Sequence, residues 1–138
     1  MTTPIRFSGV DVDLATRIAF TTTIASQVAA AAEVVIASLN LPSGFRTAEA
    51  VLLDAWVAFL VGASGTAVRL RIRRTDINGS VVGDTDALTG GITAGNKLAQ
   101  DVSGSDATSV GVYALTMQVT AGAAQSTISA LRFSALTI

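Results

Sequence analysis

The chain has 138 residues, of which half are hydrophobic and 14% are charged, and its formal net charge is −1. This length allows one domain with a real core, and the near-zero net charge gives no support for nucleic-acid binding. Cysteine and histidine are both absent, which excludes disulfides and thiolate chemistry and removes the commonest general base and metal ligand. Because so much of the chain is apolar, we expect either a membrane segment or a surface buried against copies of itself or a partner.

The first fourteen residues predict an extended N-terminal arm. Pro4 and Gly9 disfavour a helix, and the charged residues leave no long apolar run of the kind found in a secretory signal. The segment has too little apolar area to offset the entropy of ordering it, so a partner surface must supply the rest. The residues expected to anchor the arm on that partner are Ile5, Phe7 and Val10.

Residues 15–138 are expected to form a single domain built from strands. Runs of β-branched and alternating residues predict strands at 16–23, 34–41, 51–61, 66–74, 97–102, 112–120 and 126–138, with loops or turns at 83–95, 103–106 and 122–125. The segment 24–32 is ambiguous, because four successive alanines favour a helix while its flanks favour strands. We prefer a strand there and keep a short helix as the alternative.

The stretch from Glu49 to Arg74 organises the rest of the chain. Its first half is apolar on both sides, which is typical of a strand covered on both faces. Its second half alternates, with Val68, Leu70 and Ile72 on one side and arginines on the other. The Gly-Ala-Ser-Gly at 62–65 predicts a hairpin between the two halves. A second hairpin is predicted at Asn78-Gly79, the sequence that a two-residue type I′ turn prefers.

These strands, with no strong helix, predict an all-β protein. The expected architecture is an antiparallel β-sandwich, jelly-roll-like, preceded by the extended arm at residues 1–14. A jelly roll and an immunoglobulin-like Greek key both fit the number and spacing of the strands.

The residues from 50 to 68 are the best candidate for a membrane span. A central Asp54 costs about 2.5–3.5 kcal/mol on insertion scales, and Gly62 and Gly65 dilute the apolar run. The arginines that follow at once have strand spacing. We therefore favour a strand and expect no membrane partner.

The densest charge cluster is an arginine comb at the end of this stretch. It could be a solvated sheet face, or it could bind carboxylates of a neighbouring subunit, a phosphate or a sulfated sugar. No aromatic residue alternates with these arginines, as binding of single-stranded nucleic acid would require, and no nucleic-acid partner is expected. The comb consists of Arg69, Arg71, Arg73 and Arg74.

Two residues of the apolar strand are inter-subunit candidates together with the arginine comb. Asp54 is expected either at a bend or buried and paired, for instance with an arginine, because an unpaired buried charge is very costly. Trp56 is expected in the core rather than on a ligand platform.

No catalytic, cofactor-binding or metal-binding residues are expected, and we expect no enzyme. The aspartates fit no calcium loop of 12 residues, nothing marks a carboxylate pair in one cleft, and Gly90-Gly91 with Gly95 lacks the spacing of a phosphate loop. The aspartates considered are Asp76, Asp84, Asp86, Asp101 and Asp106.

Three segments of the chain resemble small structural proteins of tailed bacteriophages. They are Val-Arg-Leu-Arg-Ile-Arg-Arg (68–74), Tyr-Ala-Leu-Thr-Met-Gln-Val-Thr-Ala-Gly (113–122) and Ser-Thr-Ile-Ser-Ala-Leu-Arg-Phe-Ser-Ala-Leu (126–136). The resemblance covers residues 34–138 and rests on composition and strand pattern, and the family includes head decoration (cement) proteins and head-fibre sandwiches. It implies a homotrimeric jelly roll on a capsid shell, with the arm reaching across subunits of the major capsid protein through Ile5, Phe7 and Val10.

The hypothesis that follows is a non-enzymatic virion protein of the capsid surface, a decoration protein that trimerises and stabilises the shell. One alternative is a trimeric sandwich that binds a carbohydrate or a receptor, either a fibre tip or a protein of tumour-necrosis-factor-like shape. The other is a small membrane protein. One Trp and one Tyr in the whole chain offer little stacking surface for sugars.

Overall fold

The protein folds from strands alone wherever its structure is described. A computed structural model describes residues 5–7, 10–12, 18–21, 27–28, 32–41, 50–62, 67–85, 94–120 and 126–137. The strands are β1 (Ile5–Phe7), β2 (Val10–Val12), β3 (Ile18–Thr21), β4 (Gln27–Val28), β5 (Glu33–Asn40), β6 (Val51–Leu60), β7 (Ala67–Arg74), β8 (Val81–Asp84), β9 (Lys97–Asp106), β10 (Val112–Thr120) and β11 (Ser126–Thr137).

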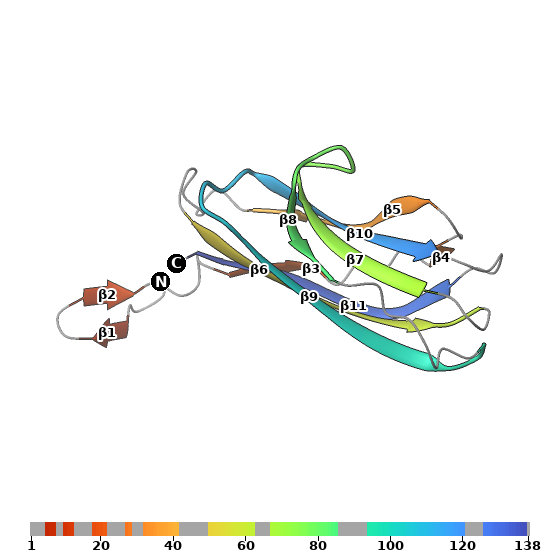
Figure 1. Cartoon of the computed structure of the whole chain (residues 1–138). Helices are drawn as coiled ribbons and strands as arrows, with labels where there is room; N and C mark the ends of the chain where they lie inside the picture. The colour runs from red at the N-terminus through yellow and green to blue at the C-terminus, as the bar shows by residue number, and fades with distance from the viewer. Residues whose placement is uncertain are drawn as a thin grey trace.

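Eight of these strands form a jelly roll. They are hydrogen-bonded in the order β3-β11-β6-β9-β8-β7-β10-β5, with every neighbouring pair antiparallel, and β4 pairs with β11. The sheet folds over into two layers, β3-β11-β6-β9 and β8-β7-β10-β5 (Figure 1). If these eight strands alone are numbered from one to eight along the chain, strands one, eight, three and six make the first layer. Strands two, seven, four and five make the second layer. This is the jelly-roll order, so the predicted fold class is confirmed. The order decides for the jelly roll and against the immunoglobulin-like Greek key.

Two glycines join the layers along one edge. The only residue pair between β8 and β9 in the described sheet is Gly83 with Gly104. A Cβ on Gly83 would lie 2.7 Å from the carbonyl oxygen of Ser103, and one on Gly104 would overlap the carbonyl of Val82. Only glycine allows two backbones to approach so closely.

The core lies between the two layers and is filled by alternate residues of the long strands. The predicted inward set of β7, Val68, Leu70 and Ile72, is fully buried. The other inward residues with at most 4% exposure on β6, β10 and β11 are Val51, Leu53, Ala55, Val57, Phe59, Tyr113, Leu115, Met117, Val119, Ile128, Leu131, Phe133 and Ala135. The period of two in the sequence therefore gives the correct inner face for each of these strands.

The predicted hairpin between residues 51–61 and 66–74 is wrong. β6 pairs with β9 and β11, whereas β7 pairs with β8 and β10, so the two strands lie in opposite layers. The prediction of a strand covered on both faces is also wrong within the chain. The inner face of β6 lies under the second layer, but Leu52 and Leu60 on its outer face are 43% and 37% exposed.

Two loop predictions also need correction. Residues 103–106, predicted as a loop, continue β9, because β9 pairs with β6 in unbroken register from Lys97 to Asp106. Likewise β8 extends to Asp84, two residues into the predicted loop at 83–95. Ladder hydrogen bonds from neighbouring strands override the turn-like Ser-Gly-Ser-Asp composition.

The turn at Asn78-Gly79 joins β7 and β8 as predicted, but it is not a two-residue turn. The Gly79 amide donates to the carbonyl of Asp76 (3.0 Å), and the Asn78 amide donates to the carboxylate of the same aspartate (2.8 Å). The turn therefore spans 76–79, and Gly79 is its last residue rather than a central one. Glycine is needed there because a Cβ would overlap the carbonyl of Arg74.

The arm contains a small hairpin of its own. β1 and β2 pair antiparallel, with Ile5 opposite Val12 and Phe7 opposite Val10, in a sheet separate from the jelly roll (Figure 1). The side chains of the three proposed anchors lie outside the described part of the structure. Within 24–32, β4 supports the predicted strand, and the other residues up to Ala31 lie outside the described ones.

Candidate interaction surfaces

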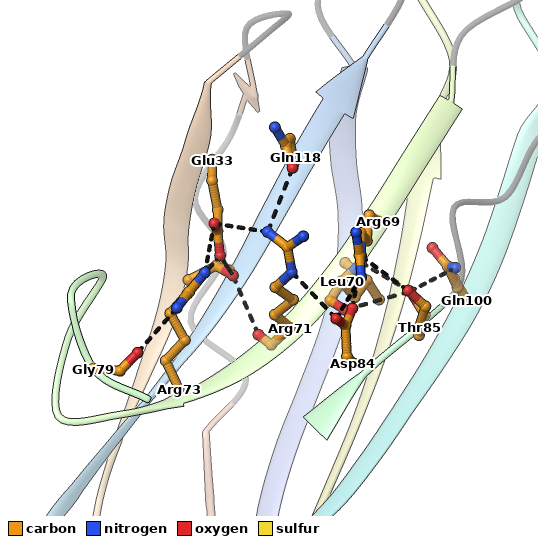
Figure 2. A network of polar contacts seen from close by, with 11 residues as sticks. Glu33, Arg69, Leu70, Arg71, Arg73, Gly79, Asp84, Thr85, Gln100 and Gln118 are labelled. Carbon is orange, nitrogen blue, oxygen red and sulfur yellow. Dashed lines mark hydrogen bonds and ion pairs between the residues drawn. The ribbon is translucent and has the colours of Figure 1, made fainter. Parts of the chain in front are cut away.

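The outer surface of the β8-β7-β10-β5 layer, here called the comb face, carries three of the four comb arginines. Arg69, Arg71 and Arg73 alternate with the buried residues of β7 and point outward (Figure 2). Two carboxylates reach toward them, Asp84 from the neighbouring strand β8 and Glu33 from β5, which lies beyond β10 on the other side. The arginines are therefore held within the chain.

Glu33 is the centre of this network. Its carboxylate accepts hydrogen bonds from Arg73 Nε (2.7 Å) and Nη2 (2.8 Å), from Arg71 Nη1 (2.9 Å) and from the Thr116 hydroxyl (2.6 Å) (Figure 2). The hydrogen bond from Arg73 is the main reason that the pKa of Glu33 falls from 4.5 to about 2, although burial opposes the shift. The same bond raises the pKa of Arg73.

Asp84 completes the network on the other side of β7. Arg69 Nε donates to it at 2.7 Å, and Arg71 Nε approaches it at 3.4 Å. Burial raises the pKa of Asp84, but the hydrogen bond and charge of Arg69, joined by those of Arg71, outweigh it and lower the pKa. Arg71 thus bridges two carboxylates 51 positions apart in the chain, Glu33 and Asp84.

The network covers the sheet beneath it. Thr116 faces outward by its position between the inward residues of β10, yet it is fully buried. The side chains above it, Glu33, Arg71 and Arg73, are themselves only 16–17% exposed. Such charges stabilise a fold when they are fully paired, and they leave little free bonding capacity for a partner.

Arg74 belongs to a different cluster, at the end of the sandwich. Its Nε lies 2.9 Å from Asp106, and its Nη2 donates to the carbonyl of Thr108 (2.7 Å). Tyr113 donates to the same aspartate at 2.8 Å and accepts from the Val110 amide. Burial, together with Asp106, raises the pKa of Tyr113 to about 12. This cluster fixes the connection between β9 and β10.

The opposite layer has a very different outer surface, here called the β6 face. It consists of the outward side chains of β6 and of its neighbours β9 and β11, most of them apolar or small. Leu52 and Leu136 face each other across the two strands and are 43% and 37% exposed. The described members are Leu52, Asp54, Trp56, Ala58, Leu60, Lys97, Ala99, Asp101, Ser103, Ser105, Thr127, Ala130, Arg132, Ser134 and Leu136.

Asp54 and Trp56 both lie on the β6 face. Asp54 is neither at a bend nor buried, since it sits within β6 with its side chain 52% exposed. It is paired with an arginine, Arg132, but at 3.7 Å and with both groups open to solvent. Trp56 is partly buried and is not a core residue. An exposed pair of this kind contributes little to stability, so the inter-subunit role of these residues stays a prediction.

The acidic residues considered as cation ligands have other roles. Asp84 and Asp106 hold arginines, and Asp76 caps the 76–79 turn. Asp101 is exposed on the β6 face, and Asp86 lies outside the described residues. A shallow depression of about 500 Å³ lies beside the contact between Gly83 and Gly104. It is lined by Leu52, Leu53, Asp54, Val82, Ser103, Gly104 and Ser105.

Glu33 and Asp84 are the ion-pair partners of the comb arginines, and the sequence did not identify them in this role. The alternation in the sequence predicted that these arginines point outward. Their carboxylate partners come from β5 and β8, and the sequence does not indicate that these strands lie near the arginines. A lone acidic residue at the start of the apolar strand 33–40 was the one available signal. Its position in the sequence does not indicate which arginines Glu33 pairs with.

No protein-family model and no curated protein sequence matches the chain. Its structure is similar to VP2 of the infectious bursal disease virus subviral particle, with a TM-score of 0.60 and 13% identity over 88% of this chain and 33% of VP2. A structure of the T13 particle of this virus gives a TM-score of 0.64 and 12% identity over 88% of this chain and 31% of that one. The Eiger TNF of S. frugiperda gives a TM-score of 0.55 and 10% identity over 88% of this chain and 92% of that one.

These likenesses show a shared fold. The chain spans 31–33% of the length of the viral chains that it matches, and identities of 10–13% carry no more than architecture. In the described part of the chain, no helix is long and apolar enough to cross a membrane.

Proposed function

We propose that this chain is a non-enzymatic structural protein of a virus particle, which self-associates and decorates a capsid shell. The observation that carries the proposal is the contrast between its two outer faces. The charges of the comb face are paired within the chain, while the β6 face exposes Leu52, Leu60 and Leu136 around the partly buried Trp56. A surface of that composition on a small sandwich is typical of an assembly contact.

The fold supports the same proposal. The fold is shared with proteins of the infectious bursal disease virus particle. Many copies on one shell would gain strength through avidity, since each copy needs only a modest contact. The proposed location is the surface of the capsid, the proposed partners are the major capsid protein and further copies of this chain, and the proposed unit is a trimer.

In this proposal the arm is the tether. Ile5, Phe7 and Val10 supply the anchors, and the jelly roll supplies the assembly contacts. Deleting residues 1–13 should leave the mass in solution and the melting temperature nearly unchanged, because β1 and β2 form a sheet separate from the jelly roll. Attachment to the shell should weaken strongly.

The test is co-sedimentation of intact and truncated chains with shells assembled from the major capsid protein of the same genome, with light scattering for mass. Binding by the intact chain alone, and a mass that is a multiple of three chains, support the proposal. Equal binding by both chains would move the shell contact off the arm. Failure of the intact chain to bind any shell would contradict decoration.

The match to Eiger TNF favours a second candidate, a receptor-binding sandwich, because it spans 92% of that chain. A carbohydrate-binding version is disfavoured by the aromatic residues. The single tyrosine, Tyr113, is fully buried, which leaves Trp56 as the only described aromatic side chain on an outer face. Sugar sites rely on exposed rings for stacking.

A further inference from the structure

We infer that the β6 face binds the β6 face of a second copy of this chain, about a two-fold axis that runs parallel to β6 and passes over Trp56. The inference rests on the self-association in the proposed function and adds to the proposed trimer a second, two-fold contact, for which it names the surface. It follows from the register of three strands, the distribution of charge across them and the side chains left exposed.

The register arranges the β6 face in rows across the sheet. The central row is Arg132, Trp56 and Asp101, from β11, β6 and β9 in that order. The next row is Ala130, Ala58 and Ala99, which leaves the surface low beside the tryptophan. A large aromatic side chain next to a shallow strip of alanines gives a ridge beside a hollow. The two-fold axis along β6 places each row opposite the same row of the second copy, so Trp56 faces Trp56 and the alanine row faces the alanine row.

The charges of the central row are complementary to themselves. Arg132 lies one strand to one side of Trp56 and Asp101 one strand to the other. A two-fold axis along β6 exchanges the two sides, so Arg132 of each copy meets Asp101 of the other. Two ion pairs then flank the paired tryptophans, and such contacts of aromatic residues and arginine commonly dominate an isologous interface.

The charges of the face cancel in number, although the axis places Asp54 opposite its own copy. The described members include two cations, Arg132 and Lys97, and two anions, Asp54 and Asp101, so the face has no net charge to repel its own copy. Asp101 has no ion pair within the described residues, and Arg132 is 63% exposed with only the long contact to Asp54. Both charges are therefore available to a partner.

The size of the face suits a modest interface. At a rise of about 3.3 Å per residue and about 4.8 Å between strands, three ten-residue strands cover ~500 Å². Standard interfaces bury ~800 Å² per partner, so this pairing falls at the lower end of specific contacts, with an expected dissociation constant in the micromolar range. The comb face has exposed apolar residues at its margins, Val35 (39%) and Val81 (41%), but its centre is occupied by the paired arginines and carboxylates.

The test is a charge swap measured by sedimentation equilibrium over a wide range of concentrations. Arg132→Glu and Asp101→Arg each place like charges opposite each other twice, so each should raise the dissociation constant by roughly 100-fold. An equimolar mixture of the two variants should pair again, because every contact then joins opposite charges. The double variant carrying both changes should pair with itself for the same reason.

The control variant is Lys97→Glu, a reversal of equal size on the same face. The two-fold axis places Lys97 opposite Thr127 of the other copy, so this change should leave the dissociation constant within a few-fold of the original. The intact chain should occur in even numbers, two chains or six if a trimer contact is also made, and each single swap should halve that number. Circular dichroism checks that each variant is folded.

Each other outcome overturns the inference. Single swaps that pair like the intact chain, or a mixture that fails to restore pairing, would exclude this register. A face that covers the shell instead would give no pairing at any concentration, while Arg132→Glu weakens co-sedimentation with shells. That result would contradict the pairing of two copies and would still support the proposed function. Pairing of the intact chain without any binding to shells would support the pairing of two copies and contradict the proposed decoration of a shell.

Discussion

The two outer faces of the sandwich come from strands with nearly the same inner pattern and very different partners. β6 and β7 both bury every second residue, but β7 turns arginines outward, and β8 and β5 of the same layer supply carboxylates. β6 turns leucine, tryptophan and one aspartate outward, and half of the outward residues of its neighbours are alanine or serine. The face with the most charge is thus the one already satisfied within the chain. The β6 face, where the pair of Asp54 and Arg132 is long and open to solvent, is the one with capacity left for a partner.

The largest test of this comparison concerns two adjacent residues of β6. Leu53 is 1% exposed in the core and Leu52 is 43% exposed on the β6 face. Leu53→Ala should lower the free energy of unfolding by about 3–4 kcal/mol, because it leaves a cavity, whereas Leu52→Ala should cost less than about 1 kcal/mol. Urea titration of both variants measures this. Equal losses would mean that the inner and outer faces of β6 are assigned wrongly.

The next test removes the centre of the arginine network. Glu33→Gln leaves Arg71 and Arg73 with no full negative charge between them, in a site where the three side chains are only 16–17% exposed. The free energy of unfolding should fall by about 2–3 kcal/mol. Denaturant titration at neutral pH measures the change. A loss below about 0.5 kcal/mol would show that the comb face is a solvated surface after all.

The same network predicts a pH dependence. Folding lowers the pKa of Glu33 from 4.5 to about 2, so the folded chain binds fewer protons than the unfolded chain in that interval. The stabilisation by Glu33 is therefore complete above pH 4.5 and is lost as the pH falls through about 2. The unfolding free energy of the Glu33→Gln variant should vary less with pH across this window. Parallel curves for the two chains would contradict the role given to Glu33.

The sequence predicted what each strand buries but not which strands meet. The period of two gave the inner faces of β7 and β10, since burial follows from local alternation. The Gly-Ala-Ser-Gly at 62–65 could not show whether the chain returns beside β6 or crosses to the other layer. Both routes need the same flexible connection, and the choice is made by the pairing of β6 with β9 and β11.

The candidate sites were limited by the same physics. Arg71 and Arg73 were found from their spacing, but the carboxylate of Glu33 comes from a strand 38 and 40 positions away. Trp56 was expected in the core because large aromatic residues usually are buried, and its neighbours in the sequence are apolar. Its actual place depends on a single step of register, which moves every side chain of a strand to the other face.

A smaller effect on folding is expected at the centre of the β6 face. Trp56 is partly buried, so Trp56→Ala should cost about 1–2 kcal/mol in unfolding rather than the 3–5 kcal/mol of a core aromatic. Its effect on association should be larger, because an aromatic residue at the middle of an interface commonly carries much of the binding energy. Unfolding is measured on the Arg132→Glu background, where the chains are separate. A full core-sized loss there would return Trp56 to the core.

The smallest effect is expected for Asp54, and it distinguishes the two faces most directly. Its pair with Arg132 is 3.7 Å long, with the side chains 52% and 63% exposed, so Asp54→Asn should change the free energy of unfolding by less than about 0.5 kcal/mol. The variant removes the same single charge as Glu33→Gln and is its matched control. On a two-fold axis along β6, Asp54 also faces its own copy, where two like charges repel. Removing them should therefore tighten association slightly while stability stays constant. Measured by sedimentation equilibrium, weaker association of Asp54→Asn would show that Asp54 meets a cation of the partner and that the axis lies elsewhere.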